Sequence, residues 1–378
     1  MRVLSLETEG FRNLSAGKIE PHPSLNLILG DNAQGKTNLL ESLWCCTGCR
    51  SFRGAKEKDY IALHARDMHI RMRFADSQRE QEIQIHMQRG DGKQKKILLN
   101  GVQLPGAAKL FSAFQCVIFS PDDRELIRQG PERRRSFMDL CGSQLTPAML
   151  GCIRRFERLM AVRNTVLKDI SLGKASRKSL ADWDSQLAAL GSLLTCLRYQ
   201  YIRQLSAVCE QLYAKITDEK ETLSVKYRSN LFKNTEISEK PTPEMQKHYF
   251  EALQKSVDDD IRLGYTAKGA GRDDFVCKIN GLSVRDFGSQ GQQKSTALVL
   301  KLGQAAVFYE KKQETPIILL DDVMGELDAR RQALCYHMME DMQVFLTTCQ
   351  PEALGKEHTA DCIVYHMADG AVTAENRE

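Results

Sequence analysis

The sequence has no hydrophobic run long enough to cross a membrane. Its longest apolar stretch toward the end, residues 297–309, is interrupted by Lys301, whereas a bilayer needs about 20 consecutive apolar residues. The first four residues lead directly into Glu7 and Glu9, so no secretory signal peptide is expected. These absences argue against a membrane-embedded protein, though not against a subunit docked on one, and a cytoplasmic location is expected.

Features of a disulfide-bonded or zinc-stabilised domain are also missing. The chain has 12 cysteines, and because no signal peptide is expected, these cysteines are expected to stay reduced. Cys45, Cys46 and Cys49 include a C-x-x-C pair, but no second pair or histidine cluster lies near it in the sequence. These thiols are expected to pack in the interior, and no zinc is predicted for the chain.

Neither sign of charge is in large excess. The net charge is +4 over 378 residues, of which 42% are apolar and 27% charged. This composition predicts a folded chain that buries a large core in two lobes. Basic residues nevertheless form clusters, which are candidates for binding DNA phosphates although most such clusters are simply solvated faces. The favoured ones are Arg50, Arg53, Lys56 and Lys58, with Arg154 and Arg158 second.

One segment matches a nucleotide-binding motif completely. Gly30-Asp31-Asn32-Ala33-Gln34-Gly35-Lys36-Thr37 fits G-x-x-x-x-G-K-[ST], with a strand-like apolar run before it and helical spacing after it. This order lets backbone N–H groups and a helix N-terminus surround a triphosphate. Lys36 is expected to contact the β- and γ-phosphates of ATP, and the Thr37 hydroxyl is expected to bind Mg²⁺. The basic cluster at residues 50–58 lies beyond that helix, so its removal is expected to leave ATP binding unaffected.

An apolar strand near the other end of the chain, residues 315–322, ends in two acids. Asp321 is predicted to hold Mg²⁺, and Asp322 is predicted to act as the general base toward the attacking water. A strand end can be acidic merely because it is solvated. The interpretation therefore depends on two neighbours, the segment 288–293 before the strand and Gly325-Glu326-Leu327-Asp328 after it.

The order of these elements resembles the ATP-binding-cassette class of P-loop ATPases. That resemblance implies that Ser289, Gly291 and Gln292 of one subunit contact the γ-phosphate held by a second subunit, with Ser289 taking part in catalysis. It also implies that Asp328 lies in a loop at the dimer interface. A serine hydroxyl and a helix N-terminus both favour an anion. Locally, the same segment is explained equally well as a turn that caps a helix.

Hydrophobic periodicity, together with the resemblance to cassette ATPases, predicts an α/β fold with a mixed-sheet ATPase lobe (1–120 and 262–378) and an inserted helical lobe (121–261). Strands are expected at 2–9, 25–29, 69–74, 82–88 and 96–100, with a hairpin turn at Asn100-Gly101. Thr146-Pro147 and Thr242-Pro243 each predict a helix start. The first of these helices and an apolar stripe from 180 to 216 predict an antiparallel hairpin of two similar helices, each ~40 Å long.

Over nearly its full length the chain resembles the RecF family of bacterial recombination mediators, which have an ABC/SMC-type P-loop ATPase head. The matching stretches are Phe11-Arg12-Asn13, the phosphate loop, Ser51-Phe52-Arg53, 119–123, 130–139, 289–293 and 321–328. The resemblance implies an ATP-driven homodimer that binds gapped or junction DNA, assists recombinase loading and damage (SOS) signalling, and works with RecR. It also adds Arg12 to the residues that bind the nucleotide.

The chain departs from the family pattern at several points. It has Gly269-Ala270-Gly271-Arg272-Asp273-Asp274 where Gly-Pro-His-Arg-Asp-Asp is typical, and Gly325 where serine is usual. Relative to the wider cassette class, Pro121-Asp122 and Thr347-Thr348-Cys349 replace a glutamine and a histidine that position water. A slow, DNA-stimulated ATPase that acts as a switch is therefore predicted. The alternatives are a transporter's ATPase subunit, which would have a shorter helical insert, and an ATP-gated scaffold that does not hydrolyse ATP.

Overall fold

The computed structural model of the chain describes residues 1–90, 94–349 and 362–375. Its backbone divides into two compact units. Unit 1 comprises Met1–Asp123 and Leu298–Glu378, and unit 2 comprises Arg124–Ala297. The first boundary lies close to the predicted one, but the second follows residue 297 rather than residue 261.

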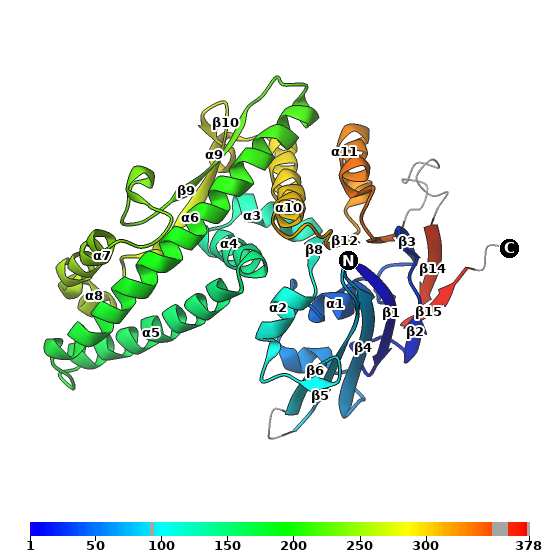
Figure 1. Cartoon of the computed structure of the whole chain (residues 1–378), viewed down its shortest axis with the longest axis horizontal. Helices are drawn as coiled ribbons and strands as arrows, with labels where there is room; N and C mark the ends of the chain where they lie inside the picture. The colour runs from blue at the N-terminus through cyan, green and yellow to red at the C-terminus, as the bar shows by residue number, and fades with distance from the viewer. Residues whose placement is uncertain (91–93, 350–361, 376–378) are drawn as a thin grey trace. The chain divides into compact units, whose positions relative to one another are not determined.

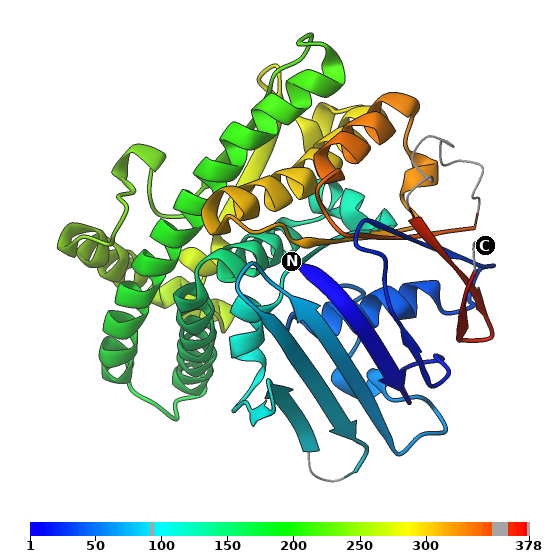
Figure 2. The ribbon, with the colours of Figure 1, turned by 45° about the vertical axis from the view of Figure 1, so that its right-hand side comes forward.

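Unit 1 contains an antiparallel sheet built from the first third of the chain, with strand order β2-β1-β4-β5-β6-β7. Figure 2 shows the long strands β1, β4 and β5 side by side. Buried side chains alternate with more exposed ones along β4 and β5, as expected for a sheet with one covered face. The strands are β1 Arg2–Glu9, β2 Gly17–Ile19, β4 Asp67–Ala75, β5 Glu80–Gln88, β6 Gln94–Leu99 and β7 Val102–Gln103. The predicted hairpin turn is confirmed, because Asn100 and Gly101 have φ angles of 53° and 76° between β6 and β7.

A second sheet in unit 1 has the order β15-β14-β3-β13-β12-β8 and is parallel except for β15. Every residue of β12 and β13 is buried, as is typical of parallel strands covered on both faces. Because the strands run the same way, β3, β12 and β13 all end at one edge of this sheet. The strands are β3 Leu25–Leu29, β8 Cys116–Phe119, β12 Ile317–Asp321, β13 Val344–Thr348, β14 Cys362–Ala368 and β15 Ala371–Ala374.

The helix that follows β3 is enclosed by the rest of unit 1. Eight of the ten residues of α1 (Lys36–Cys45) are buried, and the helix contacts β12 and β13. A helix covered on nearly every side is fixed by its packing, so its N-terminus is held firmly at the end of β3. The other elements of this unit are α2 Leu110–Ala113, α11 Ala329–Met339 and the short helices η1 Glu57–Tyr60, η2 Ala107–Lys109, η3 Pro121–Arg124 and η7 Met324–Glu326.

Unit 2 is mainly helical. Its two longest helices, α5 (Pro147–Ser171) and α6 (Ala181–Thr217), are joined by a short connection and pack along each other, as Figure 1 shows. Thr146 is the N-cap of α5 with Pro147 in its first turn, as predicted. The expectation of similar lengths is wrong, since α5 has 25 residues and α6 has 37. The remaining helices are α3 Glu125–Arg128, α4 Pro131–Leu145, α7 Pro243–Lys255, α8 Val257–Leu263, α9 Val284–Phe287 and the short η4 Arg177–Leu180, η5 Asn234–Glu236 and η6 Ala270–Arg272. Helix α10 (Gln290–Lys312) spans the boundary at residue 297.

A small antiparallel sheet explains why the second boundary was misplaced. Strand β10 (Asp274–Ile279) pairs with β9 (Leu223–Arg228) along its whole length and with β11 (Leu282–Ser283) at its end. Strands that follow residue 262 were expected in the ATPase lobe. Their partner strand instead precedes residue 262, so these residues belong to unit 2.

Buried ion pairs tie the elements of unit 2 together. The Arg163 guanidinium on α5 lies 2.6 Å from an Asp184 carboxylate oxygen on α6 and 2.7 Å from one of Asp260 on α8, with all three side chains fully buried. It also donates to the Thr266 hydroxyl at 2.8 Å. Removing one partner from such a cluster leaves an uncompensated buried charge, which is strongly destabilising.

A second polar cluster involves the segment that departs from the family pattern. Asp273 is buried and accepts hydrogen bonds from the Tyr227 hydroxyl and, at 2.7 Å, from the Asn230 N–H. Arg198 pairs with Asp139 at 2.7 Å and donates to the Ala270 carbonyl at 2.7 Å. These contacts involve Asp273 and a backbone carbonyl, so they do not need the proline and histidine that are missing here.

Within the described residues, no helix has both the length and the apolar character required to span a bilayer.

Candidate nucleotide site

The phosphate loop connects β3 to α1 through a backbone that requires glycine at two positions. Gly35 is the N-cap of α1 with a φ of 114°, in the left-handed region that side chains disfavour. A Cβ atom on Gly30 would collide with the backbone carbonyl of Met367 on β14. Asp31, Asn32 and Ala33 are exposed, and α1 directs its first turn toward them. The loop therefore has the backbone conformation of an anion-binding turn at a helix N-terminus.

Lys36 is held against the loop by neutral groups. Its ammonium donates to the carbonyls of Gly30 and Asp31 at 2.6 and 2.9 Å and to the Cys349 sulfur at 3.1 Å. The residue is only 7% exposed, and among the described residues no carboxylate lies within ion-pair distance of it. A buried cation without a counter-charge favours an anionic ligand.

Thr37 and Asp321 meet where α1 and β12 come together. The Thr37 hydroxyl donates to an Asp321 carboxylate oxygen at 2.8 Å, and the Thr347 hydroxyl of β13 donates to the same oxygen at 3.0 Å. Burial raises the pKa of Asp321 above its ordinary value, while these two hydrogen bonds and the nearby Arg53 act in the opposite direction. Mg²⁺ prefers hard oxygen ligands from hydroxyls and carboxylates, so the two groups predicted to hold it fit the ion.

Asp322 follows directly in a special conformation. Its φ is 53°, its N–H donates to the Thr347 carbonyl and hydroxyl at 3.2 and 3.1 Å, and its side chain is exposed. The left-handed turn therefore separates the two acids, with Asp321 facing the interior and Asp322 facing solvent. That difference is consistent with separate roles in metal binding and in proton transfer.

Asp328 has a local structural role. It is the N-cap of α11, where its carboxylate accepts the Arg331 N–H at 3.0 Å and pairs with the Arg331 guanidinium. Gly325, also exposed, has open space around it and no positive φ. Nothing in the backbone requires glycine at that position.

The signature segment, Gly288–Gln293, starts α10 and belongs to unit 2. The Ser289 hydroxyl accepts the Gln292 N–H at 3.2 Å, and the Gln292 side chain accepts the Ser289 N–H at 2.9 Å. This reciprocal pair is a capping box, so the simpler local explanation of the segment is confirmed. Gln292 also donates to Glu221 at 2.7 Å, whereas Ser289 and Gly291 are exposed.

Arg12 and Gln34 have partners within unit 1. Arg12 forms an ion pair with the buried Glu41 of α1 at 2.8 Å and lies over the Tyr60 ring, which places it beside the helix of the phosphate loop. The Gln34 carbonyl and side chain accept the N–H groups of Gly370 and Asp369, at 3.1 and 2.5 Å. The β14–β15 turn, which lies near the C-terminal end of the sequence, thus contacts and supports the phosphate loop. Binding of nucleotide by these residues stays a prediction.

The two basic clusters lie in different units. Arg50, Lys56 and Lys58 are exposed in unit 1, and Arg154 and Arg158 are exposed one turn apart on α5 of unit 2. Arg53 differs from the others, because its guanidinium donates to the Asn38 side chain on α1 at 2.9 Å and its charge acts on Asp321. The expectation that this cluster is separate from the nucleotide site therefore does not fit Arg53.

The structure adds residues that motif matching did not assign. Thr347 connects both acids, and Cys349, which donates to Asn32 at 3.1 Å, holds the Lys36 ammonium. Both lie at the end of β13, which pairs in register with β12 and β3. In the sequence, these residues stand out only because they occupy the place of an expected histidine. The parallel pairing of these strands is the signal that would have placed them at the site.

The fold and the site together define an ABC/SMC-type P-loop ATPase head. A family model described as RecF/RecN/SMC N terminal domain matches residues 2–372. A structure of an Smc head domain derived from Pyrococcus furiosus has a TM-score of 0.53 at 13% identity and shares the fold alone.

Proteins with higher sequence identity to this chain identify its family within that class. The chain is 33% identical to the DNA replication and repair protein RecF of Lachnoclostridium phytofermentans, over 98% of this chain and 99% of that protein. It is 35% identical to the RecF protein of Desulforamulus reducens, over 92% of both. A solved structure of the recombination mediator protein RecF-ATPrS in the RecFOR pathway has a TM-score of 0.91 at 30% identity, covering 99% of this chain and 98% of that one. The chain belongs to the RecF family.

Proposed function

We propose that this protein is an ATP-driven DNA-binding switch of replication-linked recombinational repair. The observation that carries the proposal is the pairing of Thr37 with Asp321 beneath a complete phosphate loop. Relatives named as DNA replication and repair proteins, and a neighbour described as RecF-ATP in the RecFOR pathway, support the process and the nucleotide. The protein would act in the cytoplasm, on gapped or junction DNA, together with RecR and in damage signalling.

ATP would bind with its phosphates along the loop. Lys36 would exchange its carbonyl and thiol contacts for the β- and γ-phosphate oxygens. Thr37 and Asp321 would hold Mg²⁺, which supplies charge neutralisation at those oxygens. Asp322, exposed beside them, would accept the proton of the attacking water.

Replacing Asp322 by asparagine tests the hydrolytic role. Asp322→Asn should bind ATP normally and slow phosphate release by about 10²–10⁴-fold, the usual contribution of a general base. Phosphate release at the parent rate would remove Asp322 from this role. If the parent protein binds ATP and closes onto DNA but releases no phosphate, the protein is an ATP-gated scaffold instead.

The second half of the site would come from another copy of the chain. Ser289 and Gly291 are exposed at the start of a helix, where an anion is favoured. Gln292 would have to release Glu221 to reach a phosphate, so the contact between Gln292 and Glu221 opposes closure until ATP is present. Asp328 would lie at the same interface.

Sedimentation velocity with ATP, ADP or no nucleotide tests this arrangement directly. The parent protein should dimerise with ATP alone. Ser289→Arg should bind ATP as a monomer, while Ser171→Arg, with the same charge change at an exposed serine of unit 2, should dimerise like the parent. Dimerisation of Ser289→Arg at the parent level would contradict the composite site.

DNA binding should follow dimerisation, because two weak basic surfaces would then act together. The double variant Lys56→Ala, Lys58→Ala avoids Arg53 and its contact with α1. If these lysines bind phosphates, affinity should fall for all sequences alike, and the slope of log affinity against log salt should flatten by about one to four units. An unchanged slope would mean that these lysines do not contact DNA phosphates, and Arg154 and Arg158 on α5 would become the preferred candidates.

A further inference from the structure

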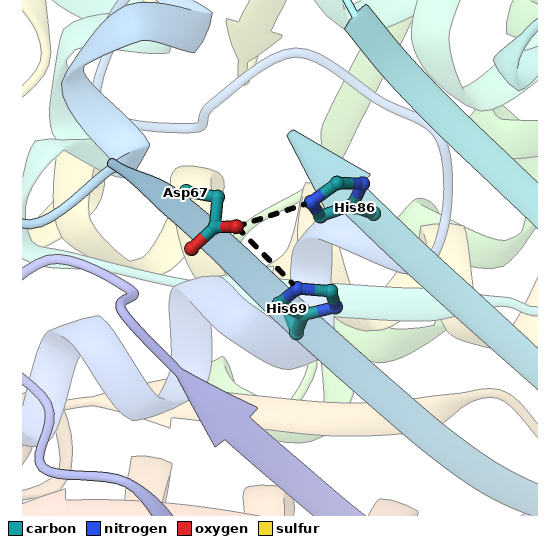
Figure 3. Close-up of side chains that lie close together, drawn as sticks. All are labelled: Asp67, His69 and His86. Carbon is teal, nitrogen blue, oxygen red and sulfur yellow. Dashed lines mark ion pairs between the residues drawn. The ribbon is translucent and has the colours of Figure 1, made fainter. Parts of the chain in front are cut away.

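Three potential metal ligands lie together on the antiparallel sheet of unit 1. The phosphate loop follows a strand of the second, mainly parallel sheet. Asp67 and His69 are two residues apart on β4, so they project from the same face. His69 is directly opposite His86 of β5 in the strand register. Figure 3 shows the Asp67 carboxylate directed between the two imidazoles. The buried side chains Met68 and Ile70 point to the opposite face.

The backbone fixes this arrangement. Residues directly opposite on antiparallel strands have Cβ atoms about 4.5–5.5 Å apart, and the two imidazoles stack with ring centroids 4.2 Å apart and planes 22° apart. Both Nε2 atoms face the same oxygen of Asp67, at 3.9 Å from His69 and 3.6 Å from His86. The three ligand atoms lie within 4.8 Å of one another.

The two oxygen–nitrogen distances come close to the ligand separations of a tetrahedral metal centre. Zinc binds imidazole nitrogen and carboxylate oxygen at about 2.0–2.2 Å, which places two ligand atoms on a tetrahedron roughly 3.4 Å apart. The distances from the Asp67 oxygen to the two nitrogens exceed that value by a few tenths of an ångström, within the reach of small side-chain rotations. The exposed fraction of these side chains ranges from 25% to 52%, so an ion could reach them from solvent.

We propose that Asp67, His69 and His86 form a site for a first-row transition-metal ion, zinc in particular. Two imidazoles and one carboxylate are a ligand set that zinc uses, with one coordination position left for water or another ligand. Hard ions such as Mg²⁺ prefer oxygen ligands and do not compete for it. The site is independent of the nucleotide, because none of the three residues contributes to the phosphate loop or to the acids of β12.

Two charged side chains next to the cluster should change its affinity for a metal cation in opposite directions. Glu9 of β1 is opposite His69, and Lys96 of β6 is opposite His86 in the register of the sheet. The lysine opposes a cation, and the glutamate favours one. Lys96→Gln should therefore tighten the site, whereas Glu9→Gln should weaken it.

Isothermal titration of the full-length protein with Zn²⁺ tests the site. The titration is done with ADP and excess Mg²⁺, which occupy the Thr37–Asp321 site, at about pH 7.5, above the ordinary imidazole pKa of about 6.5. One equivalent should bind. His86→Gln and His69→Gln should each weaken binding by about tenfold or more, since even outer-sphere changes at zinc sites cost 10–100-fold.

A matched control is available elsewhere in unit 1. His366 lies 3.4 Å from Glu375, an exposed histidine–carboxylate pair without a second histidine in the cluster, so His366→Gln should bind zinc like the parent. Co²⁺ provides a second readout, with a visible spectrum that lacks the near-ultraviolet band of cobalt–thiolate bonds. Failure of the parent to bind zinc, equal binding by His86→Gln, loss of binding in His366→Gln or a thiolate band would each overturn the proposal.

Discussion

Arg163 and Lys36 are both buried basic side chains, but they contact chemically different groups. In unit 2, Arg163 faces two carboxylates and a hydroxyl, all buried. In unit 1, Lys36 faces two carbonyls and a thiol, and the nearby acid Asp321 is bonded to hydroxyls. The charge of Arg163 is balanced by direct ion pairs, whereas neither Lys36 nor Asp321 forms a direct ion pair with any other described residue.

This difference separates a structural charge from a functional one. A buried ion pair that is complete holds elements together, and removing one member costs stability. A buried charge that lacks a counter-ion costs stability until a ligand supplies the opposite charge. Substitutions in the two regions should therefore affect different measurements.

The largest effect is expected for Arg163→Met, which leaves Asp184 and Asp260 buried without a cation. Unit 2 should lose about 3–5 kcal/mol of unfolding free energy. The chain has two tryptophans, Trp44 in unit 1 and Trp183 in unit 2, so urea unfolding in a Trp44→Phe background follows unit 2 alone. Arg155→Met, at an exposed arginine on the same helix, should change stability by less than about 0.5 kcal/mol. A similarly small loss for Arg163→Met would show that the Arg163 ion pairs do not stabilise unit 2.

Lys36→Met should show the reverse pattern. It removes the charge and keeps most of the apolar stem, so ATP binding should weaken by about 2–5 kcal/mol, the usual cost of truncating one member of a buried charge pair. Stability without nucleotide should hardly change, because the substitution removes the cost of the buried charge together with its hydrogen bonds to neutral groups. Fluorescent-nucleotide titration and thermal unfolding of the same samples measure both quantities. A large loss of stability with intact ATP binding would make Lys36 a structural residue.

Asp321→Asn is expected to raise stability when Mg²⁺ is absent. Burial raises the pKa of Asp321 in the folded state. At a pH between the ordinary carboxyl pKa and this raised pKa, the folded protein therefore keeps a proton on Asp321, whereas the unfolded chain has released it. The unfolding free energy of the parent therefore falls as pH rises through that window. The advantage of the asparagine variant should appear there and persist at neutral pH.

Thermal unfolding at about pH 4 and pH 7, with a chelator or with Mg²⁺ and nucleotide, measures this effect. Mg²⁺ and nucleotide should stabilise the parent but not Asp321→Asn. The exposed neighbour provides the control, since Asp322→Asn should not show the gain. A variant that is less stable than the parent at neutral pH would mean that the Asp321 charge is compensated within the chain after all.

The smallest effect is expected for Gly325→Ser, which restores the residue usual in the family. The space around Gly325 is open and its φ is not positive, so stability should change by less than about 0.5 kcal/mol. ATP-driven dimerisation in sedimentation velocity should be unchanged or slightly tighter, because serine adds a hydroxyl. Weaker dimerisation would show that the interface needs the small residue.

Local signals in the sequence predicted local structure well. The strands at 2–9 and 25–29, the Asn100-Gly101 turn and the Thr146 cap were all read from short patterns, because each depends on side chains a few residues apart. The class of the site followed from the phosphate loop for the same reason.

Features that depend on distant residues were not predictable in this way. The boundary after residue 297 follows from the pairing of β10 with β9, about 50 residues earlier in the chain. The contact of Arg53 with Asn38 and the histidine cluster on β4 and β5 depend on a chain reversal and on strand register. A one-residue change in the register of β5 against β4 would move His86 to the face opposite His69.

The position of β3 has a consequence for how the protein is made. β3 carries the phosphate loop and pairs with β13 and β14, whose residues are more than 300 positions later in the sequence. During synthesis, unit 2 is a continuous segment that can fold as it leaves the ribosome, while β3 has no partners until the last strands emerge. A chain halted before β13 would therefore contain the complete motif and still be unable to hold ATP. We therefore expect the nucleotide site of unit 1 to form only after these last strands have been synthesised.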